Sequence, residues 1–369
     1  MSQTTPDTTL RDAAPELQDE IDRLLAAVAP KANARVAREL LTAAVALATD
    51  DVERLDLKIA TAALTEMRDA FRVFAPYHDV PKVTIFGSAR TRPDDPVYDQ
   101  ARRIAADLAG RGWMIVTGAG PGIMAAGMEG AGREQSIGVS IRLPWEQEAN
   151  SIIAGDHKYV AMKYFFTRKL MLIKESKAFI CLPGGFGTLD ETFELLTLTQ
   201  TGKGLPVPIV FLDTPGDTYW KHVEDFIQEE LVTRGLVTPD DVGLFLVTDD
   251  CTVAAHEVLH FYANYHSLRY VGDQLVIRLR QAPDDQQLIE LNRRFGHLCR
   301  RGRIERSEPL AIEVRESDAL DLQRIRFTFA RHGFAQLRDL IDALNDLVEP
   351  SSAASSSAAS AALQPPPTR

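Results

Sequence analysis

One stretch of the chain reads AFICLPGGFGTLDE, from Ala178 to Glu191, and it combines the two features that decide the fold. It opens with an apolar run of strand length, and its glycine-rich remainder leads directly into the apolar helical pattern of residues 193–198. A buried strand that passes through a glycine-rich turn into a helix is the repeating unit of a parallel sheet.

The same arrangement recurs along the centre of the chain, where short apolar runs end in glycine-containing turns. The further pairs of run and turn are Val83–Phe86 with Gly87-Ser88, Met114–Thr117 with Gly118–Gly122, and Pro208–Leu212 with Asp213–Gly216. Apolar residues at helical spacing, such as Ala101, Ile104, Ala105 and Leu108, lie between the runs. This pattern predicts an α/β fold with a parallel sheet covered on both faces, whose ligands bind outside the carboxyl ends of the strands.

Outside this centre the chain divides into three further segments. Residues 1–80 carry apolar side chains at helical spacing and predict an N-terminal helical extension before a central domain at 81–267. Residues 268–349 predict a small C-terminal α+β unit, with strands at Gln274–Leu279 and Arg324–Phe329 and helices near 288–298 and 334–347. Residues 350–369 are rich in Ser and Ala and end in prolines, which predicts a disordered tail.

Composition restricts the class of protein. With 369 residues, 45% of them hydrophobic and 25% charged, the chain is typical of folded, water-soluble proteins. A net charge of -11 argues against general nucleic-acid binding. The three cysteines form no CxxC pair, so neither a disulfide framework nor a metal site is expected. No targeting segment and no membrane-spanning run is found in the sequence, so we expect a cytoplasmic protein.

The glycines of the turn Gly118–Gly122 resemble a dinucleotide-binding motif, but their spacing does not match it. Ile123 stands where the third glycine of GxGxxG is needed, and the next run, 137–143, carries Arg142 and no acidic residue for a ribose. The turn still offers backbone N–H groups at the start of a helix, which suit an anion.

The turn at Pro183–Glu191 is the strongest candidate for a phosphate site. Its glycines permit close backbone approach, the helix start favours negative charge, and Thr188 adds a hydroxyl. It is not a P-loop, because the GK[ST] ending is absent. A plain strand-to-helix turn remains the alternative. Upstream, Arg168 and Lys169 supply two cations that suit an anionic ligand.

With these motifs in place, the chain resembles the LONELY GUY (LOG) family of nucleotide phosphoribohydrolases, also labelled lysine decarboxylase-like. The PGGxGTxxE signature matches Pro183–Glu191, and the preceding Arg-Lys pair matches Arg168-Lys169. The resemblance covers about 80–266 and implies a Rossmann-like doubly wound fold, usually dimeric. It also implies hydrolysis of the N-glycosidic bond of a nucleoside 5′-monophosphate, such as AMP or a cytokinin riboside monophosphate, to free base and ribose 5-phosphate.

The resemblance also assigns residues. Arg168 and Glu191 correspond to the catalytic pair. The implied substrate-binding set is Gly87, Ser88, Gly118, Gly120, Gly122, Asn150, Lys169, Gly184, Gly185, Phe186, Gly187, Thr188 and Thr197. Two positions depart from the family, because short plant-like members carry a glutamate near Asn150 and related longer members carry one where this chain has Ala125. The chain is thus similar to a long bacterial-type member.

Two other functions are weighed against this hydrolase. A carrier or sensor, like the molybdenum-cofactor carriers of related fold, would bind a phosphorylated ligand without turnover, and the presence of both Arg168 and Glu191 favours the enzyme. A true lysine decarboxylase would need pyridoxal phosphate on a lysine, and Lys163, Lys169, Lys174 and Lys177 show no recognisable context for it. We therefore expect no cofactor, with a homodimer or higher homo-oligomer as the assembly.

The C-terminal unit contains a run of cations in an otherwise acidic chain. These residues are Arg293, Arg294, Arg300, Arg301 and Arg303. These cations could bind a regulatory nucleotide or an acidic face of a neighbouring subunit. A helix end whose charged side chains simply face water accounts for them equally well.

Overall fold

The computed structural model describes residues 15–28, 33–142 and 149–348. The predicted tail at 350–369 lies outside the described residues. Residues up to Asp69 form one compact unit, and residues from Ala70 onward form a second. Across the described ranges, no helix combines the length and the apolar character needed to cross a membrane.

The first unit is helical, as the sequence predicts. It holds α1 (Pro15–Val28), α2 (Ala34–Thr49) and most of α3 (Arg54–Phe74). The helices α1 and α2 pack together, and Arg38 of α2 donates to Asp22 of α1 at 2.6 Å.

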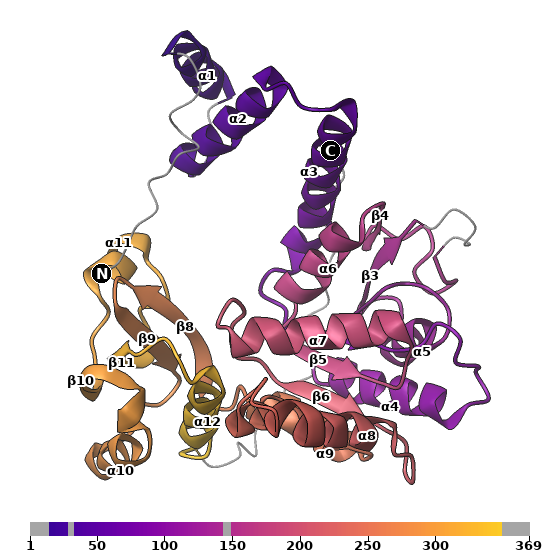
Figure 1. Cartoon of the computed structure of the whole chain (residues 1–369), viewed down its shortest axis with the longest axis vertical. Helices are drawn as coiled ribbons and strands as arrows, with labels where there is room; N and C mark the ends of the chain where they lie inside the picture. The colour runs from indigo at the N-terminus through magenta and orange to yellow at the C-terminus, as the bar shows by residue number, and fades with distance from the viewer. Residues whose placement is uncertain (1–14, 29–32, 143–148, 349–369) are drawn as a thin grey trace, which may run out of the picture. The chain divides into compact units, whose positions relative to one another are not determined.

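A seven-stranded parallel sheet forms the centre of the second unit (Figure 1). Its strands are β1 (Lys82–Phe86), β2 (Met114–Thr117), β3 (Ser136–Ile141), β4 (Tyr159–Met162), β5 (Ala178–Cys181), β6 (Ile209–Leu212) and β7 (Leu246–Thr248). Their order is β4-β3-β2-β1-β5-β6-β7. The chain winds outward from β1 to β4 and then returns to place β5 on the other side of β1, so the order reverses between β1 and β5. This confirms the doubly wound fold, and ligand sites in such sheets lie at the reversal.

Helices cover both faces of this sheet. They are α4 (Pro96–Gly110), α5 (Ile123–Ala131), α6 (Phe165–Lys174), α7 (Phe186–Gln200), α8 (Tyr219–Phe226) and α9 (Cys251–His260). One core cluster joins α4, α5 and α9 to one face, and another joins α6, α7 and α8 to the opposite face. In β5, Ile180 belongs to the first cluster and Phe179 to the second. Because successive side chains of a strand point to opposite faces, a strand covered on both sides must be apolar throughout.

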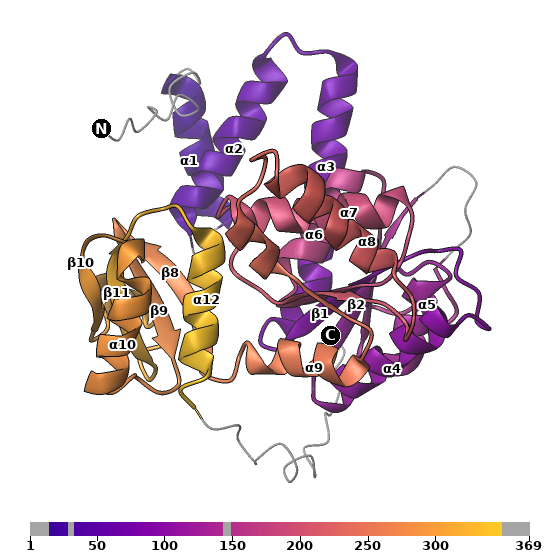
Figure 2. The ribbon, with the colours of Figure 1, turned by 60° about the horizontal axis from the view of Figure 1, so that its bottom comes forward.

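A second, antiparallel sheet follows in the chain, with strand order β10-β11-β9-β8. Its elements are β8 (Tyr265–Val271), β9 (Gln274–Leu279), α10 (Asp285–Phe295), β10 (Cys299–Arg306), α11 (Ala311–Glu316), β11 (Gln323–Phe329) and α12 (Phe334–Asn345). The predicted α+β unit is therefore found, although its first strand starts at Tyr265, before the predicted boundary at 267. Figure 2 shows α12 between this sheet and the rest of the second unit.

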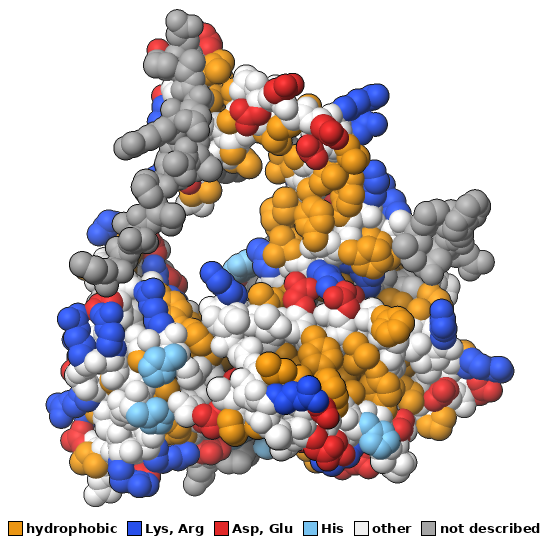
Figure 3. Space-filling model, viewed as in Figure 1, with side chains coloured by type: hydrophobic (Ala, Val, Ile, Leu, Met, Phe, Trp, Pro, Cys, Tyr) orange, Lys and Arg blue, Asp and Glu red, His pale blue; other side chains and the backbone are white. Residues whose placement is uncertain are grey.

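Three of the five cations in the basic run of the C-terminal unit have acidic partners on the same unit. Arg293 binds Glu290 at 2.6 Å, and Arg301 binds Asp273 at 2.6 Å. Arg300 also contacts Asp273, at 3.2 Å. Figure 3 shows basic side chains on the outer surface of this unit. Such exposed pairs are typical of a solvated surface, so a regulatory ligand there stays a prediction.

Candidate active site

Three strand-end turns meet where the strand order reverses. The N–H of Ser88, after β1, donates to the carbonyl of Pro183, after β5, at 3.3 Å. The N–H of Ile123, at the start of α5, donates to the Ser88 carbonyl at 3.0 Å. Gly122 has φ +65°, and a Cβ there would lie 2.7 Å from the carbonyl carbon of Ala89. Gly122 therefore lets two turns touch, and its role is packing between them.

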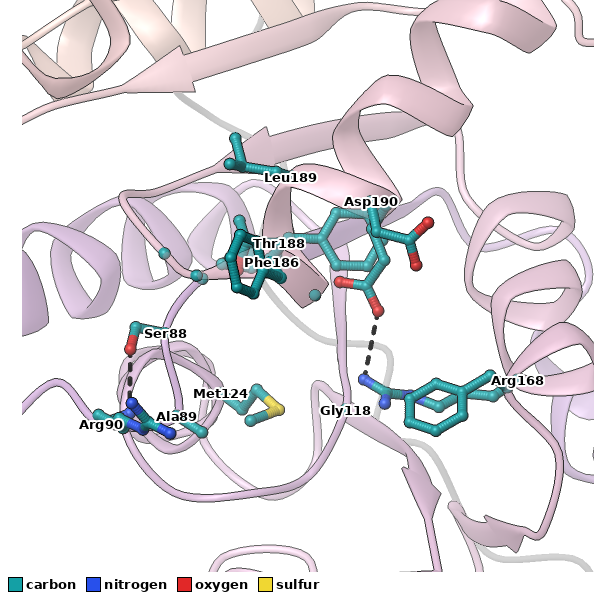
Figure 4. Close-up of a pocket in the computed structure, with 18 of the residues that line it drawn as sticks. Ser88, Ala89, Arg90, Gly118, Met124, Arg168, Phe186, Thr188, Leu189 and Asp190 are labelled. Carbon is teal, nitrogen blue, oxygen red and sulfur yellow. Dashed lines mark hydrogen bonds and ion pairs between the residues drawn. The ribbon is translucent and has the colours of Figure 1, made fainter. Parts of the chain in front are cut away.

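A cavity of about 790 Å³ lies at this junction (Figure 4). It is lined by many of the residues selected from the sequence, namely Gly87, Ser88, Gly118, Arg168, Gly184, Gly185, Phe186, Gly187, Thr188 and Glu191. These residues come from the ends of β1, β2 and β5 and from two helices, α6 and α7. The structure thus gathers at one place residues that are up to about a hundred positions apart in the chain.

The glycine-rich turn after β5 forms one wall of the cavity. Helix α7 begins directly after Gly185, and a Cβ on Gly185 or Gly187 would meet no heavy atom within 4 Å. Gly184 differs, because a Cβ there would lie 2.6 Å from the Cβ of Thr188. The hydroxyl of Tyr219 donates to the Gly184 carbonyl at 2.7 Å and fixes the turn. The wall therefore presents an open helix N-terminus, which favours an anion.

The opposite part of the cavity holds an ion pair. Nη2 of Arg168 lies 3.4 Å from Oε1 of Glu191, and each side chain is 12% exposed. Gly118 makes room for the guanidinium, since a Cβ at that position would lie 2.6 Å from Arg168 Nη2. Nε of Arg168 is buried and finds no hydrogen-bond partner among the described residues. The pair therefore lies at the wall of the cavity, and one N–H of its guanidinium is buried without a hydrogen-bond partner among the described residues.

Burial raises the pKa of Glu191 to about 7, although Arg168 and Lys169 act to lower it. A carboxyl group is costly to ionise when it is removed from water. With its pKa near neutrality, Glu191 can hold or release a proton in the pH range in which proteins work, as proton transfer in catalysis requires.

Two further residues selected from the sequence, Lys169 and Thr197, do not line the cavity. The ammonium of Lys169 binds Asp190 at 2.7 Å and Glu194 at 2.9 Å, so it is held on the surface of α7. Although burial opposes it, hydrogen bonds to these two carboxylates raise the pKa of Lys169. Thr197 is exposed, and its hydroxyl donates to the Phe193 carbonyl at 2.8 Å.

Asn150 and Gly120 are also absent from the lining. The Asn150 side chain donates to the Gly120 carbonyl at 3.1 Å, and its main-chain N–H donates to the Ala119 carbonyl at 2.8 Å. Asn150 therefore holds the turn after β2 in position.

Other lining residues were not selected from the sequence. They are Ile85, Phe86, Ala89, Arg90, Met124, Phe165, Leu189, Asp190 and Tyr219. Arg90 follows the turn after β1 directly, so a cation beside a strand-end turn is a signal that could have identified it. Tyr219 follows β6 and lies 35 positions from its partner Gly184, and no local pattern indicates that contact.

Comparison with known proteins bears on this site. The family described as "Possible lysine decarboxylase" matches residues 122–258. A cytokinin riboside 5′-monophosphate phosphoribohydrolase from Mycobacterium tuberculosis is 30% identical over 163 residues, which cover 42% of this chain and 81% of the relative. A protein of the same description from Arabidopsis thaliana is 28% identical over 162 residues, or 43% of this chain and 72% of the relative.

Among solved structures, the molybdenum cofactor carrier protein from Chlamydomonas reinhardtii matches with a TM-score of 0.35 and 22% identity. The match covers 49% of this chain and 96% of that protein. The glycine-rich turn and the Arg168–Glu191 pair both lie within residues 122–258, the range that the family matches. The chain belongs to the LOG family, whose curated relatives are named cytokinin riboside 5′-monophosphate phosphoribohydrolases.

Proposed function

We propose that the protein hydrolyses the N-glycosidic bond of a nucleoside 5′-monophosphate and releases the free base and ribose 5-phosphate. One observation carries this proposal: a single cavity holds both an open, glycine-rich helix N-terminus and a buried Arg168–Glu191 pair. The first suits a phosphate, and the second suits the positive charge that develops at C1′. Membership of the LOG family supports the same reaction.

The proposed reaction uses water as the nucleophile. The bond between C1′ and the base nitrogen breaks, a bond from C1′ to the water oxygen forms, and the water proton passes by way of Glu191 to the departing base. The ionised carboxylate stabilises the oxocarbenium-like transition state, as carboxylates do in glycoside hydrolysis. Its pKa of about 7 lets it accept and return the proton.

Arg168 and the phosphate contacts position the substrate. Arg168 holds the Glu191 carboxylate at 3.4 Å and lines the cavity in which the sugar would lie. The N–H groups at the start of α7 bind the 5′-phosphate at a point remote from the breaking bond. Binding energy gained there orients the ribose and lowers the barrier at C1′.

To test this proposal, the purified full-length protein is incubated with a panel of nucleoside 5′-monophosphates that includes AMP and cytokinin riboside monophosphates, and the released base is measured. We expect base release from at least one monophosphate and poor release from the matching nucleosides. Tight binding without release from any member would replace this proposal with the carrier function.

A further inference from the structure

A second cation, Arg90, lies in the cavity and is not used by the reaction described above. It follows β1 and lines the cavity together with Ser88. Figure 4 shows Ser88 and Arg90 at one end of the cavity and Arg168 at the other, with the glycine-rich turn between them. The main-chain N–H of Arg90 donates to the Ser88 hydroxyl at 3.1 Å, so its backbone position is defined.

The acidic groups of the site are already paired with other cations. Glu191 lies against Arg168, and Asp190 is bound by Lys169 at 2.7 Å. Over the described part of the chain, no carboxylate lies within ion-pair distance of the exposed Arg90 guanidinium. The next arginine along the chain, Arg92, lies outside the cavity and is paired with Asp94 at 3.1 Å. Arg90 thus brings an uncompensated positive charge to the end of the cavity beside the turn after β1.

This turn is tied to the glycine-rich wall. Ser88 donates its main-chain N–H to the carbonyl of Pro183, which directly precedes Gly184. A ligand anion that rests on the helix N-terminus of α7 therefore lies next to the segment that carries Arg90. Backbone N–H groups provide only partial charges, and a guanidinium beside them adds a full positive charge and charge-assisted hydrogen bonds to a phosphate.

We propose that Arg90 is a phosphate-binding residue that makes the site selective for 5′-phosphorylated nucleosides, an inference that rests on the proposed function. Its guanidinium grips two phosphate oxygens on the side opposite the α7 N–H groups. A planar guanidinium suits this bidentate contact better than an ammonium. Arg168 is not available for this role, because Glu191 holds it at the other end of the cavity.

The experiment compares Arg90→Gln, Arg90→Lys and the control Arg92→Gln in the full-length protein. The first readout is the ratio of kcat/KM for AMP to kcat/KM for adenosine. Loss of one charged hydrogen-bonding partner is expected to lower this ratio by about 10- to 100-fold in Arg90→Gln. Arg90→Lys should recover part of the loss, and Arg92→Gln should match the wild type.

The second readout is the affinity for ribose 5-phosphate, measured by calorimetry without turnover. We expect Arg90→Gln to weaken it by the same factor as it lowers the kinetic ratio. If the wild type releases no base but Arg90→Gln still weakens ribose 5-phosphate binding, the proposed function fails and the role of Arg90 stands. An unchanged affinity in Arg90→Gln, or an equal loss with AMP and adenosine, would overturn the assignment of Arg90.

Discussion

Glu191 shows how one residue combines burial, charge and chemistry. It is buried, lies against a guanidinium, and is carried on the first turns of α7. A solvated carboxylate would be ionised throughout the neutral range. Burial moves the pKa of Glu191 to about 7, which makes its protonation state depend on pH where the protein is used.

We predict that Glu191→Gln lowers kcat by about 10²- to 10⁴-fold and leaves AMP affinity within a few fold, because the lost charge matters mainly in the transition state. In the wild type, kcat/KM should rise with pH through about 7, since the active form is the ionised carboxylate. Initial rates from pH 5 to 9 test both points. Glu194→Gln is the control, because Glu194 binds Lys169 and does not line the cavity. Turnover that survives in Glu191→Gln would move the chemistry to another group.

Gly185 permits a second prediction at the scale of single residues. Its φ of -90° suits any amino acid, and its Cβ position faces open space, so Gly185→Val should fold normally. The added side chain would stand where a phosphate must approach the turn, and AMP affinity should fall by about 10- to 100-fold. Gly110→Val, at the end of α4 and also in open space, is the matched control. Equal AMP affinity in Gly185→Val and the wild type would exclude the turn as the phosphate site.

At the scale of elements, α7 joins the cavity to the C-terminal unit. Its first residues line the cavity, and the turn after its last residue receives Phe334 of α12. That turn contains Gly202, with φ +67°, and a Cβ there would overlap the Phe334 ring. The C-terminal unit therefore packs directly on the helix that carries Glu191.

We predict that Gly202→Ala lowers the free energy of unfolding by about 2–5 kcal/mol, the sum of left-handed strain and forced repacking. Gly235→Ala separates the two effects, because Gly235 has φ +68° and open space around its Cβ position. The free energy of unfolding of Gly235→Ala should fall by only about 1–2 kcal/mol, which is the contribution of the left-handed strain alone. Urea denaturation of both variants measures the difference. Equal losses in the two proteins would mean that the contact with Phe334 contributes nothing to stability.

At the scale of the whole molecule, the cavity is separate in sequence from the second sheet. Every lining residue falls between Ile85 and Tyr219, whereas that sheet begins at Tyr265. The two regions of the second unit are nonetheless packed together, because Arg338 of α12 pairs with Glu257 of α9 and covers the ring of Phe261 at 4.9 Å. We therefore expect the C-terminal unit to support the fold, and its role in assembly or regulation stays a prediction.

We predict that a chain ending at Ser267 keeps base release per folded molecule but unfolds at a lower temperature. The truncation uncovers Phe261, which is 1% exposed, and re-exposing a fully buried phenylalanine costs about 1.5–3 kcal/mol. Circular dichroism gives the folded fraction, the monophosphate assay gives activity, and light scattering shows whether assembly changes. A folded chain of this length without activity would mean that the C-terminal unit contributes directly to the active site.

Local patterns in the sequence are sufficient to predict the central parallel sheet and the glycine-rich turn. The run Ala178–Leu182 is short and apolar at every position, as expected of a strand buried on both faces, and Gly184 and Gly185 follow it closely. These signals are local, because the apolar character of a strand and the glycines of a turn can be recognised from a few consecutive residues. The same holds for the helical character of the first unit and for two strands of the second sheet, β9 and β11, whereas β8 and β10 are found only in the structure.

Which side chains share the cavity could not be predicted from the sequence and depends on the tertiary fold. Arg168 and Lys169 are adjacent in sequence, but successive residues of a helix point about 100° apart, so one faces Glu191 and the other faces Asp190. Tyr219 reaches the cavity because β6 lies beside β5, and Asn150 closes a turn outside it. These outcomes depend on helix rotation and strand order, which arise from contacts between distant segments and leave no pattern in the residues nearby.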